Sequence, residues 1–155
     1  MWFVVYVPEE KFREIERLVP LASFNAIIVD GEGRVLVMKR NNEPAKGLYW
    51  YPGGRIKLGQ SLEEALKEQI KEETGLEWSD LRVIKVASVD SNIFKSRHTV
   101  NINFLLKKVS KSEVQLNQGH SDFKWLRPEE FDKEKLDPYL KWALNGPWGS
   151  FTFDF

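Results

Sequence analysis

The hydrophobic pattern along the chain predicts a protein built largely from strands. Apolar residues dominate Leu21–Val29, and the polar turn Asp30-Gly31-Glu32-Gly33 separates this run from a second one that begins at Val35. Two apolar runs joined by a glycine-containing turn are typical of a β-hairpin. The pattern predicts two further long strands over 81–90 and 98–109, and shorter ones over 1–7 and 123–126.

One segment in the middle of the chain has helical periodicity and clear ends. Ser61 is a good N-cap, and Glu64 three residues later completes a capping box. Gly75 is a natural residue to end the helix. An apolar stripe for the core is formed by Leu62, Ala65, Leu66 and Ile70. Shorter helices are expected over Glu9–Leu18, from Arg127 onward and over 136–144, with an aromatic tail over 148–155. Strands with one central helix and several shorter ones predict an α+β layered fold.

Composition narrows the class of protein. A length of 155 residues fits a single domain, 1–155, and 42% hydrophobic with 30% charged residues is typical of a globular chain. The 23 basic and 23 acidic residues balance, so no strong attraction to nucleic acid or to a membrane surface is expected. Cysteine is absent, which excludes disulfides and thiolate metal sites. We therefore expect a cytoplasmic protein whose partners include neither nucleic acid nor membrane.

The segment from Pro52 to Leu76 carries the most specific signal. A tight turn, Pro52-Gly53-Gly54, precedes the central helix, and the carboxylates Glu72 and Glu73 lie at the end of that helix. This arrangement can hold a divalent metal ion against a diphosphate. The alternative is a solvated acidic helix face, in which Lys67 and Lys71 balance the glutamates.

This segment resembles the Nudix box, G-x5-E-x7-R-E-U-x-E-E-x-G-U, where U is a bulky aliphatic residue. The positions that match are Gly54, Glu72, Glu73, Gly75 and Leu76, whereas Gln60, Glu68 and Gln69 replace Glu, Arg and Glu of the pattern. The resemblance implies a Nudix-like α/β/α sandwich with a mixed β-sheet. It also implies magnesium, with manganese as an alternative. Because Gln69 replaces one carboxylate, Glu73 becomes the main expected ligand, with the Gly53 carbonyl beside it and Glu72 as a possible second ligand.

The preceding segment resembles one branch of the superfamily, the GDP-mannose mannosyl hydrolases. The sequence from Met38 to Arg55 is similar to that family's K-R-x-N-x-P-A-x-G segment followed by aromatics and P-G-G-R, and Gly119–Leu126 is similar to its H-x-D-aromatic-basic-W-L segment. The similarity extends from about Val19 to Leu126. In this family, water attacks the anomeric carbon of a nucleoside-diphosphate sugar, inverting the centre and releasing GDP.

The resemblance assigns a role to several side chains. His120 is the expected general base, since a histidine titrates near neutral pH. Arg40 and Arg55 are expected to grip the diphosphate, because the guanidinium fork matches phosphate oxygens. The remaining candidates are Gln118, beside the position of a family metal ligand, and Tyr49, Trp50 and Tyr51, which could stack on a base or sugar.

Three functions stay open from the sequence. The leading hypothesis is hydrolysis of a nucleoside-diphosphate sugar similar to GDP-mannose or GDP-glucose at carbon. The second is attack on phosphorus, assisted by Glu72 or Glu73, which gives a nucleoside monophosphate. The third is a catalytically weak domain that binds a nucleotide, supported by the replaced box residues. The aromatic-rich termini and the habit of the family also suggest a homodimer.

Overall fold

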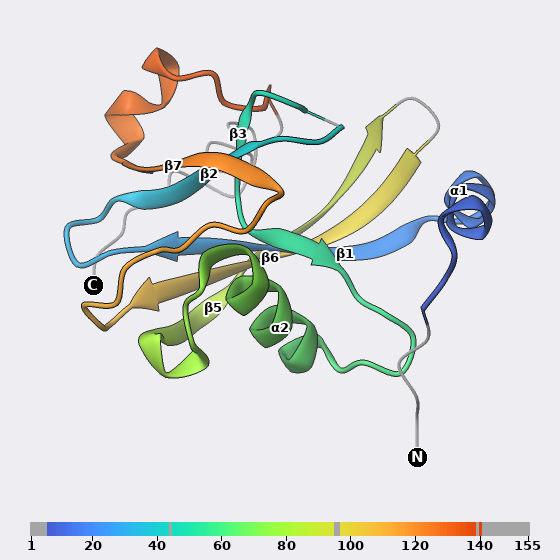
Figure 1. Ribbon diagram of the computed structural model, residues 1–155, viewed down its shortest axis with the longest axis horizontal. Coiled ribbons are helices and arrows are strands. Elements are labelled where there is room, and N and C mark those ends of the chain that lie inside the picture. The colour runs from blue at the N-terminus through green and yellow to red at the C-terminus, as the bar shows by residue number, and fades with distance from the viewer. Residues whose placement is uncertain (1–5, 44, 95–96, 139, 141–155) are drawn as a thin grey trace.

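The computed structural model describes residues 6–43, 45–94, 97–138 and 140. Within these ranges, seven strands form one mixed sheet, with the helices α1 and α2 beside it (Figure 1). The strands are β1 (Leu21–Val29), β2 (Val35–Arg40), β3 (Tyr49–Trp50), β4 (Gly53–Arg55), β5 (Leu81–Phe94), β6 (Arg97–Lys108) and β7 (His120–Leu126). The helices are α1 (Glu9–Leu18), α2 (Leu62–Thr74) and the short 3₁₀ helices η1 (Trp78–Asp80) and η2 (Pro128–Lys133).

The centre of the sheet is β1, whose two edges are paired differently. Along one edge it runs parallel to β6 from Leu21, opposite Thr99, to Val29, opposite Lys107. Along the other edge, Ser23–Asn25 pairs with β4, whereas Val29 pairs with β2. The sheet therefore forks along this edge, and β2 continues into β3 and β7 on the far side of the fork. The glycine turn of β4 lies in this fork.

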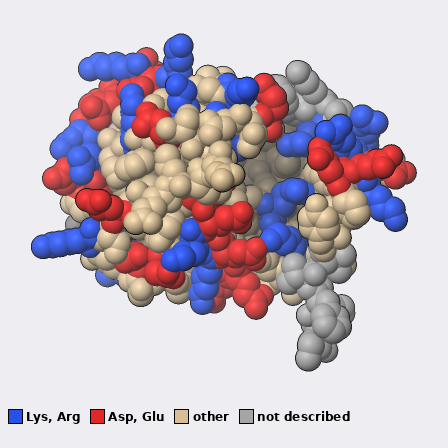
Figure 2. All heavy atoms as spheres, viewed as in Figure 1, with Lys and Arg blue, Asp and Glu red and all other residues tan. Residues whose placement is uncertain are grey.

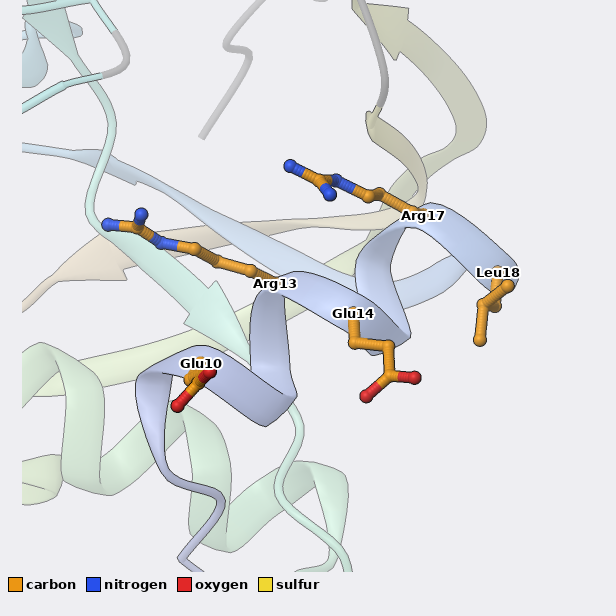
Figure 3. A pocket seen from close by; sticks show the side chains of 5 residues that line it. All are labelled: Glu10, Arg13, Glu14, Arg17 and Leu18. Carbon is orange, nitrogen blue, oxygen red and sulfur yellow. The ribbon is translucent and has the colours of Figure 1, made fainter.

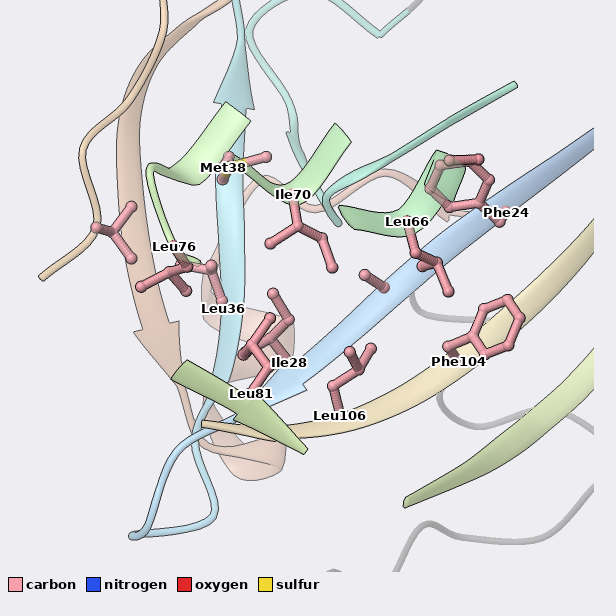
Figure 4. Close-up of a cluster of buried hydrophobic side chains, with 13 residues drawn as sticks. Phe24, Ile28, Leu36, Met38, Leu66, Ile70, Leu76, Leu81, Phe104 and Leu106 are labelled. Carbon is pink, nitrogen blue, oxygen red and sulfur yellow. The ribbon is translucent and has the colours of Figure 1, made fainter. Parts of the chain in front are cut away.

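Each face of the sheet packs against its own apolar cluster. Strand alternation sends Phe24, Ala26 and Ile28 to the face covered by α2, and Ile27 and Val29 to the opposite face. Figure 4 shows Leu66 and Ile70 of α2 directed at the first face. On the opposite face the cluster is completed by Val35, Val37, Tyr49, Tyr51, Leu105, Leu126, Phe131, Leu136 and Leu140.

The ends of α2 are as the sequence predicts. The Ser61 hydroxyl accepts a hydrogen bond from the backbone N–H of Glu64 at 3.2 Å, and the Glu64 carboxylate accepts one from the backbone N–H of Ser61 at 2.8 Å. These bonds lower the pKa of the Glu64 carboxyl. Gly75 ends the helix with φ of 71°, in the left-handed region that glycine adopts without penalty.

Most of the predicted elements are confirmed. The helix over Glu9–Leu18, the strand over Leu21–Val29 and the hairpin after it are present, as are the two long strands. Some bounds differ: β7 begins at His120, which was expected in a loop, because pairing with β2 extends that strand. Of the helix expected over 136–144, Pro138 and Leu140 are helical, and Leu136 instead bridges to Tyr49; residues 139 and 141–144 lie outside the described residues.

Two expectations fall wholly or mainly outside the described residues. Of the strand predicted over 1–7, residues 1–5 lie outside them, and residues 6 and 7 are not in a strand. The aromatic tail over 148–155 also lies outside. No helix in the part of the chain that the structure describes is both long and apolar enough to span a bilayer.

Candidate active site

Glu73 is a buried carboxylate at the end of α2, facing the glycine turn. Its side chain is enclosed, and Oε2 accepts a hydrogen bond from the backbone N–H of Gly53 at 3.1 Å. Burial raises the pKa of the Glu73 carboxyl to about 7, against the opposing effects of this bond, of a bond from Gln69 and of the Arg40 charge. A carboxylate that loses so much hydration is stabilised by a nearby cation, as expected of a metal ligand.

The glycine at position 53 is required by close packing. A Cβ at Gly53 would lie 2.5 Å from the carbonyl oxygen of Phe24 and 2.8 Å from Oδ1 of Asn25. A Cβ at Gly54 would lie 3.0 Å from the Gln69 side chain on α2. The two glycines therefore let β4 fit between β1 and α2, which brings the turn against Glu73.

His120 faces Glu73 across the site. The two side chains approach to 4.0 Å between His120 Nε2 and Glu73 Oε1. The other ring nitrogen, Nδ1, lies 3.0 Å from Oδ1 of Asn117, and the same oxygen accepts a bond from the backbone N–H of Gly119 at 3.1 Å. Because that oxygen is an acceptor, Nδ1 is assigned the proton and Nε2 the lone pair. Burial and the Arg40 charge lower the pKa of His120, so the ring is neutral at pH 7.

The two expected arginines reach different parts of the site. Arg40, at the end of β2, lies opposite His120 at an irregularity in the β2–β7 pairing, and its charge acts on Glu73. Arg55 ends β4 opposite Ser23, and its guanidinium lies over the Phe12 ring of α1, 3.5 Å from the centroid. Burial is the main cause that lowers the pKa of both guanidinium groups. Thus Arg40 lies beside the buried carboxylate, whereas Arg55 lies towards α1.

The other candidate metal ligands are more exposed. Glu72 is exposed next to Glu73 and raises the pKa of that neighbour. The Gln118 side chain is also exposed, and its backbone carbonyl accepts a bond from Asn41 at 2.9 Å. Across the described ranges, no group of three or more His, Asp or Glu side chains gathers closely enough to hold a metal ion.

The three aromatic candidates differ in accessibility. Tyr49 is 6% exposed and donates to the Asp122 carboxylate at 2.5 Å, and both burial and this bond raise the pKa of its hydroxyl. Tyr51 is 2% exposed and donates to the carbonyl of Leu140 at 3.2 Å. Trp50 is only partly buried. Of the three, Trp50 therefore offers the most surface for stacking on a ligand.

Two of the three replaced box residues, Gln60 and Glu68, form a contact of their own on the outer side of α2. Glu68 pairs with Lys57 and accepts a hydrogen bond from the Gln60 amide at 2.5 Å. Lys57 and Gln60 belong to the loop before α2, and Glu68 belongs to the helix. Their contacts therefore hold this loop against α2. Glu68 is exposed, and its carboxylate contacts this loop.

A set of polar side chains extends from the glycine turn across three strands. Asn25 donates to Asn103 at 2.8 Å, and Asn103 donates to Asp90 at 2.6 Å. The interpretation of the sequence missed this network, although polar residues alternate with apolar ones in each strand, a period-two signal for one polar face. The other members are Ser23, Ser88 and Asn101.

The sequence interpretation also missed Arg97, the first residue of β6. Its Nε and Nη2 atoms lie 3.0 Å and 2.8 Å from Oε2 of Glu16 on α1.

A separate recess on the outside of α1 is lined by Glu10, Arg13, Glu14, Arg17 and Leu18 and contains none of the site residues (Figure 3).

Comparison with known proteins identifies the family. The model of the NUDIX domain matches residues 19–143, most of the chain. The chain belongs to the Nudix family. A protein of Methanocaldococcus jannaschii named ADP-ribose pyrophosphatase is 32% identical over 127 residues, covering 76% of this chain and 74% of its own. A protein of Haloferax volcanii named low-salt glycan biosynthesis protein Agl8 is 35% identical over 144 residues. This match covers 90% of this chain and 89% of the Haloferax protein.

Solved structures confirm the predicted Nudix fold. A MutT protein from Methanosarcina mazei is similar with a TM-score of 0.69 at 23% identity, covering 80% of this chain and 90% of its own. The NUDIX domain of Shewanella oneidensis NrtR, solved with ADP-ribose, is similar with a TM-score of 0.64 at 19% identity, covering 87% and 93%. These likenesses support the mixed-sheet α+β architecture of the Nudix chain.

The residues of this Nudix protein fit the divalent cation that the family generally uses. The buried Glu73 has hydrogen-bond donors around it but a raised pKa, so an ionised carboxylate there is stabilised by a cation. Magnesium takes few protein carboxylates and completes its shell with water and phosphate oxygens. One buried carboxylate at a glycine turn suits that behaviour.

Proposed function

We propose that this Nudix protein hydrolyses a nucleoside-diphosphate sugar, similar to GDP-mannose or GDP-glucose, by attack of water on the anomeric carbon. The observation that carries the proposal is His120. Its Nε2 lone pair lies beside the buried Glu73, while its Nδ1 is fixed by Asn117. The other groups that could act as a base are less suited: position 69 is an amide, Glu72 is exposed, and Glu68 is occupied by Lys57 and Gln60.

Each group has a defined part in this reaction. Glu73 and the Gly53 carbonyl would hold the metal ion, which would supply positive charge to neutralise the diphosphate. Arg40 and Arg55 bind the diphosphate oxygens, and Trp50 is the aromatic available to stack on the base or sugar. His120 accepts a proton from water as the oxygen bonds to the anomeric carbon. The bond from that carbon to the diphosphate oxygen breaks, and the nucleoside diphosphate leaves with the electron pair.

The names of the two sequence relatives bear on the substrate class in different ways. The Haloferax relative is named for glycan biosynthesis, and sugar transfer in general uses nucleotide-activated sugars. The Methanocaldococcus relative is named for ADP-ribose, a nucleoside diphosphate whose second sugar is joined to the diphosphate through its primary hydroxyl and not through its anomeric carbon. Its name as a pyrophosphatase favours a second candidate function for this chain, in which water attacks phosphorus and a nucleoside monophosphate is formed.

The identity of the products separates these candidates. The pure protein is incubated with magnesium and a panel that contains GDP-mannose, GDP-glucose and ADP-ribose, and the nucleotides are separated by anion exchange. A nucleoside diphosphate with free sugar supports attack at carbon. A nucleoside monophosphate with sugar phosphate supports attack at phosphorus. Binding of a nucleotide without turnover would make a binding domain the better description and would contradict both enzymatic proposals.

A further inference from the structure

Two arginines of the sheet contact the helix α1. None of its ten residues is buried. Phe12 and Glu16 are four residues apart and therefore lie on one face of the helix. Arg55 of β4 covers the Phe12 ring, and Arg97 of β6 pairs with Glu16, whose carboxylate side chain is only 14% exposed.

The two arginines come from the strands on either side of β1. Arg55 lies opposite Ser23 in the β1–β4 pairing. Arg97 begins β6 two residues before Thr99, which lies opposite Leu21. Arg55 also follows Gly53 by two residues in the same short strand, so Arg55 lies between α1 and the glycine turn that contacts Glu73. In Figure 2, basic atoms gather in the recess between α1 and the body of the molecule.

Positive charge is concentrated around Arg97. Its guanidinium lowers the pKa of both Arg40 and Arg55, as a like charge does. Glu73, Asp137 and Glu43 offset part of this effect at Arg40. At Arg55 the offsetting carboxylate is Glu16, which Arg97 also uses. Within the part of the chain that the structure describes, Arg55 and Arg97 therefore share the Glu16 carboxylate, so two positive charges face one negative charge there.

We propose that Arg97 is a third diphosphate-binding arginine of the active site, and that Glu16 on α1 occupies it until the substrate replaces that carboxylate. This inference rests on the proposed nucleoside-diphosphate substrate. The planar guanidinium binds two phosphate oxygens as readily as it binds a carboxylate. A diphosphate that reaches Arg97 is repelled by Glu16, so the substrate and the α1 contact compete for the same group.

The competition gives the two partners of one ion pair opposite effects on binding. We expect Arg97→Gln to weaken the binding of GDP and of inorganic pyrophosphate by about tenfold or more, since a charge-assisted contact is lost. We expect Glu16→Gln to tighten both by roughly threefold, because the competing anion is removed. Isothermal titration calorimetry in magnesium buffer measures both without requiring turnover.

Matched controls come from an exposed ion pair of the same helix. Arg13 and Glu9 form this pair, so Arg13→Gln and Glu9→Gln make the same charge changes without removing the Arg55–Phe12 or Arg97–Glu16 contacts. These two variants are expected to bind like the wild type. If Arg97→Gln does not fold, Arg97→Lys is the second variant. It keeps the positive charge but loses the forked guanidinium group, and it is expected to bind GDP and pyrophosphate more weakly than the wild type does.

The outcomes separate this inference from the proposed function. Opposite shifts for Arg97→Gln and Glu16→Gln support the inference even if no nucleotide sugar is hydrolysed. Shifts in the same direction, as a purely structural ion pair predicts, overturn it even if hydrolysis is observed. Wild-type protein that binds neither GDP nor pyrophosphate also overturns it.

Discussion

At the scale of single residues, burial gives the site its chemistry. Glu73 and His120 face each other, and burial opposes the charged form of both. The carboxyl pKa therefore rises towards neutrality, while the imidazole pKa falls below its ordinary value. Near pH 7 the imidazole is therefore neutral and the Glu73 carboxyl is about half protonated, so a bound cation would favour the ionised carboxylate.

The raised pKa of Glu73 predicts how the stability of the metal-free protein depends on pH. The folded chain binds this proton more tightly than the unfolded chain, whose carboxyl titrates near 4.5. The contribution is therefore full below pH 4.5 and is lost as the pH rises through 7. Relative to Glu73→Gln, the wild type is expected to lose up to about 3 kcal/mol between pH 4.5 and 8.

Urea unfolding in EDTA measures this difference at several pH values. Magnesium added at pH 8 is expected to stabilise the wild type and to leave Glu73→Gln nearly unchanged. An unfolding free-energy difference that stays constant from pH 4.5 to 8 would contradict the assignment of a raised pKa.

His120 should determine both the turnover rate and the pH at which activity declines on the acid side. Replacing His120 by Gln is expected to reduce turnover by about 10²-fold or more, the lower end of general-base effects, with little change in KM. Because its pKa is lowered, activity of the wild type should persist to pH values below 6.5 before it declines. Initial rates of product release across pH test both points. A near-normal rate in the variant would show that His120 is not the general base.

At the scale of elements, the site depends on the fork between β2 and β4. The fork places the glycine turn against α2, and the β2–β7 pairing carries His120 to the same place. The capping box and Gly75 fix where α2 begins and ends, and therefore where Glu73 lies. Small changes at the turn should accordingly affect both folding and metal binding.

Gly53→Ala tests the close approach of β4 to β1. The new methyl group would overlap the Phe24 carbonyl and the Asn25 side chain, so a loss of about 1–3 kcal/mol is expected. Magnesium-dependent turnover should fall as well, because the Gly53 N–H bonds to Glu73. Gly31→Ala is the matched control, since a Cβ there has no atom within 4 Å. Thermal unfolding and rates compare the two; equal effects would refute the packing argument.

At the scale of the whole molecule, the long edge strand β5 leaves apolar side chains uncovered. Val83, Val86 and Val89 lie opposite Leu106, Phe104 and Ile102 and therefore share the face of the sheet that α2 covers farther in. They are 43%, 50% and 52% exposed. Edge strands with exposed apolar residues are favourable sites for association.

The homodimer suggested by the sequence stays a prediction, and this face of β5 is the surface on which to test it. Light scattering is expected to give twice the chain mass of 18.1 kDa. Val86→Lys should shift the mass towards the monomer without loss of activity per chain, since Val86 lies outside the site. A wild-type mass of one chain would end the prediction.

The sequence by itself determined the elements that local chemistry specifies. The apolar runs of β1, β5 and β6, the caps of α2 and the glycine turn depend on neighbouring residues, and their positions were predicted closely. The box pattern also indicated Glu73 and Gly53, because a helix fixes which side chains share a face.

Only the tertiary structure decided which of these groups are buried and which lie together. Local sequence did not show that burial of Glu73 is deep enough to raise its pKa, or that Tyr51 lies in the core and Trp50 at its margin. Contacts such as Arg97 with Glu16 join residues far apart in the chain, so their proximity follows from the sheet order. Desolvation and long-range charge depend on packing in three dimensions, and these two effects make the site.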